Sequence, residues 1–174
     1  TLEASSAASD VYKRQTSTTL FSVEELVTEV LIDSECNQAF NVTSSTGIDF
    51  GSTNGIGYFE ANGSSWPFEN GLIMTSGDVA NAAGPESGVL VDGTYAWPGD
   101  GDLEAFIPGL NAGDTNNASI IEFEFVPVSN SMSFDFIFAA EEYGTFQCTF
   151  TDAFAFLLTD SCLLYTSPSP RDAS

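Results

Sequence analysis

The strongest constraint on the fold of this chain is a strict alternation of apolar and polar residues in its second half. In Ile121-Glu-Phe-Glu-Phe125 every other residue is apolar, and the residues between are carboxylates. Met132-Ser-Phe-Asp-Phe-Ile-Phe138 places three phenylalanines on one face in the same way. Because successive side chains of a β-strand point to opposite faces, this pattern predicts two strands, each with one buried face.

Other short apolar segments predict further strands at Phe154–Leu158, Gly55–Glu60 and Gly71–Thr75, and Pro127–Ser131 is predicted as a turn. Many short strands separated by Gly, Asn and Asp indicate an all-β fold, a β-sandwich or jelly roll. A Gly/Asp/Pro-rich passage, Ser76–Asn117, is expected to be a long functional loop or to contain unrecognised short strands.

One N-terminal amphipathic helix is predicted, over Val23–Ile32. Ser22 precedes Glu25 by three residues, which is the spacing of a capping box, and Phe21 and Leu26 have the spacing of a hydrophobic staple. The apolar residues of one helical face are Val23, Leu26, Val27, Val30 and Leu31, and the solvated face carries Glu24, Glu25 and Glu29.

The two ends of the chain differ from the rest in charge. All three basic residues, Lys13, Arg14 and Arg171, lie near the termini, whereas the chain has 25 acidic residues. Residues 1–15 and 161–174 resemble translated sequencing-adaptor read-through, and we expect both to be artefacts outside the domain. The alternative is a basic N-terminal arm and a Ser/Pro-rich linker.

Residues 16–160 are long enough for a single domain with its own core, and they contain no Lys, Arg or His. We expect this domain to be truncated at its C-terminus, because the apolar strand at Phe154–Leu158 would need further strands to cover it. The acidic residues of this segment number 22, the other three being Glu3, Asp10 and Asp172. An anionic surface repels phosphate backbones and anionic lipid headgroups, so neither nucleic acid nor a membrane surface is an expected partner.

The missing residue types exclude most catalytic devices from residues 16–160. Without His or Lys there is no Ser-His-Asp or Cys-His pair, no His-ligated zinc, no Schiff-base lysine and no P-loop lysine. The catalytic arrangement that remains possible is a pair of carboxylates, as in glycosidases. A chain with this many acidic residues contains some close pairs by chance, so such pairs are weak evidence for catalysis. The chain is therefore expected not to be an enzyme. It also has no run of 18 consecutive apolar residues, so no membrane insertion of this segment is expected.

Acidic clusters make calcium the expected cofactor. Asp100, Asp102 and Glu104 alternate with other residues, and Asp92 lies upstream in the same Gly-rich passage. Calcium takes six to eight oxygen ligands on irregular backbone, so these residues are one candidate site. Glu142 and Asp152 are candidates for a second site. The alternative is an acidic turn that is only solvated.

Aromatic residues beside prolines define a candidate binding surface of Trp66, Tyr95 and Trp97. Aromatic side chains in loops stack on sugars or anchor protein partners, and the alternative is that these residues plug the ends of the core. Cys36 and Cys148 form a candidate disulfide or remain two thiols. Three asparagines match the N-glycosylation acceptor pattern: Asn41-Val-Thr43, Asn62-Gly-Ser64 and Asn117-Ala-Ser119.

Several motifs resemble the choice-of-anchor L domain family. They are Asn54-Gly-Ile-Gly-Tyr-Phe-Glu60, Gly71-Leu-Ile-Met-Thr-Ser-Gly-Asp-Val-Ala-Asn-Ala-Ala-Gly84, Ser133-Phe-Asp-Phe-Ile-Phe-Ala-Ala-Glu-Glu-Tyr-Gly144 and Phe150-Thr-Asp-Ala-Phe-Ala-Phe156. The resemblance implies a secreted bacterial surface protein with a variable C-terminal anchor, but it brings no ligand and no catalytic residues.

Three functions are therefore weighed. The first is a calcium-stabilised extracellular or cell-surface module that binds a glycan or protein ligand. The second is a structural spacer of a surface protein, whose acids only solvate it. The third is a fragment of a carboxylate-pair glycoside hydrolase.

Overall fold

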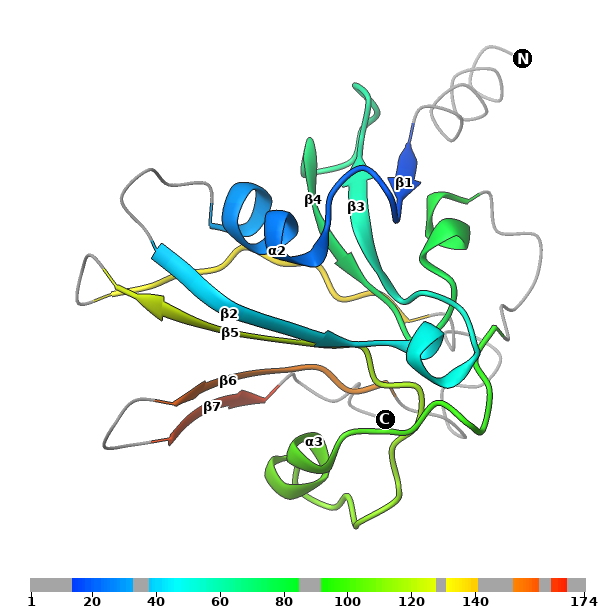
Figure 1. The fold of residues 1–174 in the computed structure, drawn as a ribbon, viewed down its shortest axis with the longest axis vertical. Helices are drawn as coiled ribbons and strands as arrows, with labels where there is room; N and C mark the ends of the chain where they lie inside the picture. Colours follow the sequence, from blue (N-terminus) through cyan, green and yellow to red (C-terminus); the bar gives the residue numbers. More distant parts are fainter. Residues whose placement is uncertain are drawn as a thin grey trace. The chain divides into compact units, whose positions relative to one another are not determined.

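Antiparallel strand pairing organises the computed structural model of this chain, which describes residues 14–32, 38–84, 92–127, 131–140, 152–159 and 164–168 (Figure 1). Among these residues the strands form a three-stranded sheet, β1-β3-β4, and two two-stranded sheets, β2-β5 and β6-β7. Their bounds are β1 Gln15–Ser17, β2 Gln38–Ser45, β3 Ile56–Glu60, β4 Asn70–Met74, β5 Ile120–Val126, β6 Ala155–Thr159 and β7 Leu164–Pro168. The all-β fold class is confirmed.

The chain divides into two units, and each is described by itself. The larger unit is Thr1–Pro98 with Asn117–Met132, and it contains the sheets β1-β3-β4 and β2-β5. The smaller unit is Gly99–Asn116 with Ser133–Ser174, and it contains the β6-β7 pair and the helix α3, Gly101–Phe106.

In the larger unit, the predicted N-terminal helix is present and begins as predicted. Ser22 Oγ accepts a hydrogen bond from Glu25 N at 3.2 Å, and Glu25 Oε2 accepts one from Ser22 N at 2.7 Å, which completes the capping box. The first turn, α2 (Val23–Glu25), continues as a π-helical segment, η1 (Leu26–Leu31), in which Ile32 N donates to Val27 O at 3.1 Å. The sequence pattern did not predict this wider turn.

The apolar face of this helix contacts both sheets of the larger unit. Leu26 and Val27 are buried, and η1 contacts β4 of one sheet and β2 of the other (Figure 1). Phe21 packs its ring on Tyr58 of β3, with the ring centroids 5.0 Å apart. The helix therefore packs against both sheets, and its fully buried residues are aliphatic.

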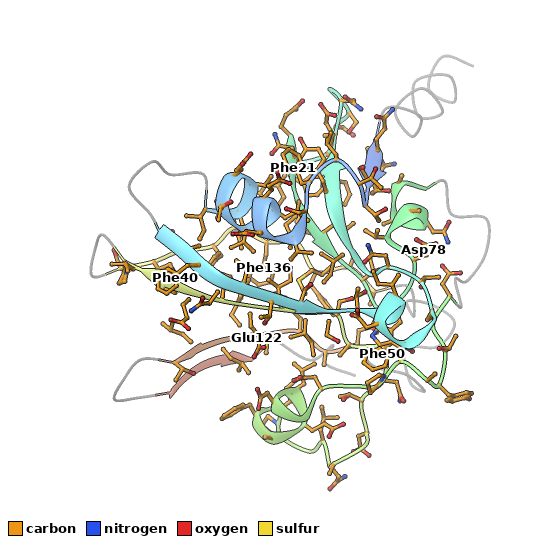
Figure 2. All side chains as sticks on the ribbon, viewed as in Figure 1. Phe21, Phe40, Phe50, Asp78, Glu122 and Phe136 are labelled. Atoms are coloured by element: carbon orange, nitrogen blue, oxygen red, sulfur yellow. The ribbon has the colours of Figure 1, made fainter. Side chains whose placement is uncertain are left out.

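The alternating segment at residues 121–125 lies within β5, as predicted. Glu122 and Glu124 are exposed, and Phe123 and Phe125 are half-buried and contact each other at 6.0 Å. β5 pairs with β2, where a register shift between Phe40 and Thr43 marks a bulge; Phe40 and Glu122 are labelled on this sheet in Figure 2. The bulge interrupts the alternation of β2, so the sequence pattern did not predict this strand.

The prediction of a strand at 132–138 is wrong in one respect. Residues 131–140 have no regular secondary structure, and among the described residues they pair with no strand. The alternating phenylalanines nevertheless contact aromatic residues in and next to β6 of the smaller unit. Phe134 stacks on Phe156 of β6 at 4.8 Å, and Phe136 contacts Phe154 at 5.6 Å. The pattern identified an extended segment with one aromatic face, but a ladder also requires a partner that no local pattern specifies.

Other predicted strands agree with the structure, since β3, β4 and β6 overlap the segments predicted at 55–60, 71–75 and 154–158. The passage 76–117 is not one long loop. Its described part contains a 3-10 helix, η3 (Val79–Ala83), and the α-helix α3. Most of the predicted turn at 127–131 lies outside the described residues.

Two described strands reach into the end segments that the sequence analysis placed outside the domain. Gln15 of β1 pairs with Glu60, and Leu164–Pro168 forms β7 against β6. The domain boundaries at residues 16 and 160 stay a prediction.

The capping box gives the first testable prediction. Ser22→Ala should lower the free energy of unfolding by about 1 kcal/mol, because the backbone N–H of Glu25 loses its acceptor. Chemical denaturation of the whole chain measures this difference. Ser22→Thr keeps the acceptor oxygen and should stay within a few tenths of a kcal/mol of the parent chain. Equal losses for both substitutions would mean that the loss does not come from the missing acceptor oxygen.

Candidate binding surface

Trp97 is not part of a binding surface, contrary to the prediction from its place in a Pro-rich loop. Its side chain is fully buried, and its indole Nε1 donates a hydrogen bond to the backbone O of Ala118 at 2.8 Å. A Cβ at Gly47 would lie 2.6 Å from Trp97 Cε3, and one at Gly55 would lie 2.9 Å from Cη2. The ring therefore fills a space that only glycines leave open. The alternative reading, in which this aromatic plugs the core, is the correct one.

The chain around Trp97 is fastened to a second segment of the larger unit. Trp97 N donates to Thr94 O at 3.1 Å, which closes a turn, and Asn117 Nδ2 donates to the same carbonyl at 2.9 Å. Asn117 N donates to Trp97 O at 3.2 Å, and Ala118 N donates to Pro98 O at 3.0 Å. The turn at 94–97 is thus held by its own hydrogen bond, by the 117–118 segment and by a buried anchor.

Tyr95 occupies this turn and is the most exposed large hydrophobic residue among those described, with a relative exposure of 102%. A tyrosine ring offers a large apolar face and a hydroxyl that can donate or accept a hydrogen bond. Because hydrogen bonds hold the backbone of the turn, the position from which the ring extends is fixed. We call residues 94–97 the tyrosine turn.

Trp66 lies in the connection between β3 and β4 and is 38% exposed. The guanidinium of Arg14 lies 5.6 Å from the centre of its ring, a distance typical of a cation–π contact. Among the ring contacts of the described residues, none joins Trp66 to the tyrosine turn. The structure therefore supports two separate exposed aromatics, with one face of Trp66 near a cation.

The acidic residues predicted to bind calcium at 100–104 lie on α3, and two of them bind backbone N–H groups. Asp100 is the N-cap residue, and its Oδ1 accepts from Leu103 N at 2.8 Å. Glu104 Oε2 accepts from Gly113 N at 2.9 Å, and its Oε1 accepts from Thr115 N at 2.9 Å and Thr115 Oγ1 at 2.7 Å. The predicted irregular backbone is a helix here, and Glu104 ties the loop that follows back onto it.

The remaining predicted ligands are described one by one. Asp92 lies in the larger unit, where its Oδ2 accepts from Asn81 Nδ2 at 2.8 Å, and Asp102 is exposed on α3. Asp152 is half-buried, whereas Glu142, Cys36 and Cys148 lie outside the described residues. Within the described ranges, no three His, Cys, Asp or Glu side chains form a group suited to a metal ion. Calcium binding stays a prediction from charge and spacing.

A small pocket of about 220 Å³ lies in the larger unit and is lined by Thr16, Ser17, Thr18, Thr19 and Ala80. These residues supply hydroxyl and backbone groups and no carboxylate. The pocket therefore lacks the paired acids that a glycosidase needs. None of the helices in the described residues has the length and hydrophobicity of a transmembrane span.

The hydrogen bonds to Glu104 predict a pH dependence. Bonds from the backbone and hydroxyl of Thr115 and the backbone of Gly113 hold the pKa of this carboxyl below its ordinary value of 4.5. The stabilisation is therefore complete well above pH 4.5 and is lost as the pH falls through the lowered pKa. Glu104→Gln should lower the melting temperature at pH 7, and the difference from the parent chain should shrink as the pH falls below about 4.5.

Asp102→Asn is the matched control for this measurement. It also removes one carboxylate from the first turn of α3, but no described hydrogen bond uses that carboxylate. Its difference from the parent chain should be small at every pH. If the Glu104→Gln chain and the parent chain have the same melting temperature from pH 3 to pH 7, the loop does not depend on this carboxylate.

Comparison with known proteins gives one match. The model of the family described as Choice-of-anchor L domain matches residues 14–170. Neither the curated proteins nor the solved structures compared with this chain give a match. The family is not a known enzyme family, and it implies export to the cell surface. Since the match covers most of the sequence, the chain belongs to the choice-of-anchor L domain family.

Proposed function

We propose that this chain is a non-catalytic binding or adhesion module of an exported surface protein, and that the tyrosine turn is part of its contact surface. The observation that carries the proposal is the full exposure of Tyr95 two residues before the fully buried Trp97. A large aromatic side chain in water on a braced turn contributes nothing to the core. The ring is therefore available for contact with a partner.

Preorganisation of the turn supports this proposal. Binding orders side chains and loops, and that entropic cost falls when the backbone is already fixed. Here Thr94 O accepts hydrogen bonds from both Trp97 N and Asn117 Nδ2, and Trp97 anchors the turn in the core. Tyrosine itself has few rotatable bonds, so little side-chain freedom is lost on contact.

Charge limits the chemistry of the partner. Residues 16–160 contain no Lys, Arg or His, so they offer no cation to bind phosphate, sulfate or carboxylate groups. Neutral glycans fit this surface, because a tyrosine ring stacks on a sugar face without a charge. Proteins with a basic surface fit it as well, because long-range attraction to an anionic domain raises their rate of association.

The tyrosine turn can be tested with a neutral-glycan array and a panel of basic proteins as probes. Tyr95→Ala should weaken binding of whichever probe binds by roughly tenfold or more, as expected for an aromatic anchor. Tyr95→Phe should retain most of the affinity if ring contact dominates. The melting temperature should be unchanged in both variants, because the side chain is exposed.

Leu20→Ala is the matched control, since Leu20 is also an exposed apolar residue of the larger unit, 61% exposed, but lies outside the tyrosine turn. It should bind like the parent chain. If no probe binds, or if Tyr95→Ala binds as tightly as Leu20→Ala, the tyrosine turn is not a contact surface. A spacer role would then account better for the domain.

Calcium stabilisation is a separate proposal, and it rests on charge. The 22 carboxylates in residues 16–160 have no basic side chain in the same segment to neutralise them. An ion that binds only the folded state stabilises it by mass action, by about 2.7 kcal/mol when its concentration is 100 times its dissociation constant. We therefore expect the melting temperature of the chain to be higher in millimolar calcium than in EDTA at matched ionic strength.

Asp100→Asn with Asp102→Asn should remove most of this calcium-dependent rise. Asparagine caps a helix about as well as aspartate, so the first substitution keeps the N-cap of α3 and changes mainly the charge. The same double variant in EDTA measures any loss that has nothing to do with calcium. Identical melting of the parent chain in calcium and in EDTA would show that the acids are only solvated.

A further inference from the structure

Three asparagines match the Asn-x-Ser/Thr acceptor pattern, and the fold gives them different environments. Asn41, Asn62 and Asn117 have φ angles of 54°, 50° and 55°, and they are the non-glycine residues with positive φ in the part of the chain that is described. Asparagine tolerates this left-handed conformation better than most residues. Backbone shape therefore does not distinguish the three, but the partners of their side-chain amides do.

Two of the three side-chain amides donate hydrogen bonds to other parts of the fold. Asn41 Nδ2 donates to Glu124 Oε1 at 3.0 Å, and the hydroxyl of Thr43, two residues later, donates to Glu122 Oε2 at 3.3 Å. Asn117 Nδ2 donates to Thr94 O at 2.9 Å and so braces the tyrosine turn. To reach either nitrogen, a glycosylating enzyme would first have to draw the amide away from these partners.

Asn62 is different, because it lies at the tip of a turn that projects from the end of β3. Ser64 N donates to Ala61 O at 2.9 Å, and Asn62 and Gly63 both have positive φ, as in a type I′ turn. The base of the turn is fixed, since Ala61 is buried and its N–H donates to Glu69 O at 2.7 Å. Asn62 is exposed, and its amide has no hydrogen-bond partner among the described residues.

We propose that Asn62 is an attachment site for an N-linked glycan in the folded, exported protein. The donor class is a lipid-pyrophosphate-linked oligosaccharide. Asn62 Nδ2 forms a bond to the anomeric carbon of the first sugar and loses one proton to a base. The bond from that carbon to the pyrophosphate oxygen breaks, and the lipid pyrophosphate leaves with the electron pair. The glycan then extends from the loop that also carries Trp66.

The test uses the purified, folded chain with an oligosaccharyltransferase that acts on Asn-x-Ser/Thr and with its lipid-linked donor. Mass spectrometry of proteolytic peptides measures the occupancy of each asparagine. Three synthetic peptides, each spanning one acceptor sequence, are treated in parallel. Dividing the occupancy of each asparagine in the folded chain by its occupancy in the peptide corrects for the sequence preference of the enzyme. Relative to these peptides, Asn62 in the folded chain should be occupied at least tenfold more than Asn41 or Asn117.

Substitutions separate the acceptor from its surroundings. Asn62→Gln and Ser64→Ala should each abolish the modification at position 62, the second without changing the turn residue itself. Asn41→Gln should leave it intact. The proposal is overturned if folded Asn62 is unmodified while its peptide is modified, or if it is occupied no more than Asn41 and Asn117 after the correction.

Discussion

Burial of the Trp97 indole is the interaction on which the larger unit most depends. The ring lies against Gly47 and Gly55, where a side chain of any size would collide with it, and its N–H is satisfied by Ala118 O. Because the same residue closes the turn at 94–97 and accepts from Asn117 N, three distant segments share one anchor. The exposed Tyr95 owes its fixed position to this anchor, so the candidate contact surface and the core are parts of one arrangement.

Carboxylates accept hydrogen bonds from nearby backbone and side-chain groups in a domain that has few cations to pair with them. Glu25, Asp100 and Glu104 accept hydrogen bonds from backbone N–H groups at helix starts and in a loop. Glu122 and Glu124 accept from side chains across the β2-β5 ladder. In Glu25 and Glu104 such bonds hold the pKa of the carboxyl below its ordinary value of 4.5, so the charged form of each is stabilised without an ion pair.

Sequence reasoning succeeded where the signal is local. The capping box needs only Ser22 and Glu25 three residues apart, and β5 needs only alternation along five residues. It failed at α3, although Asp100 as a cap and the spacing of Leu103, Phe106 and Ile107 are helix signals that the acidic pattern obscured. It also left Trp97 open between a binding surface and a core plug, because a Pro-rich context says nothing about which residues lie across from the ring.

The sequence by itself determined the all-β class, the start of the N-terminal helix, the anionic character and the family, because each depends on residue type and short spacing. Only the tertiary structure decided which aromatic is buried and which is exposed, and which of the three acceptor asparagines has an amide with no partner among the described residues. Those outcomes depend on contacts between residues such as Gly55 and Trp97, or Thr94 and Asn117, that lie far apart in the chain. Neither periodicity nor composition encodes such pairings, because they are set by how the sheets and loops pack.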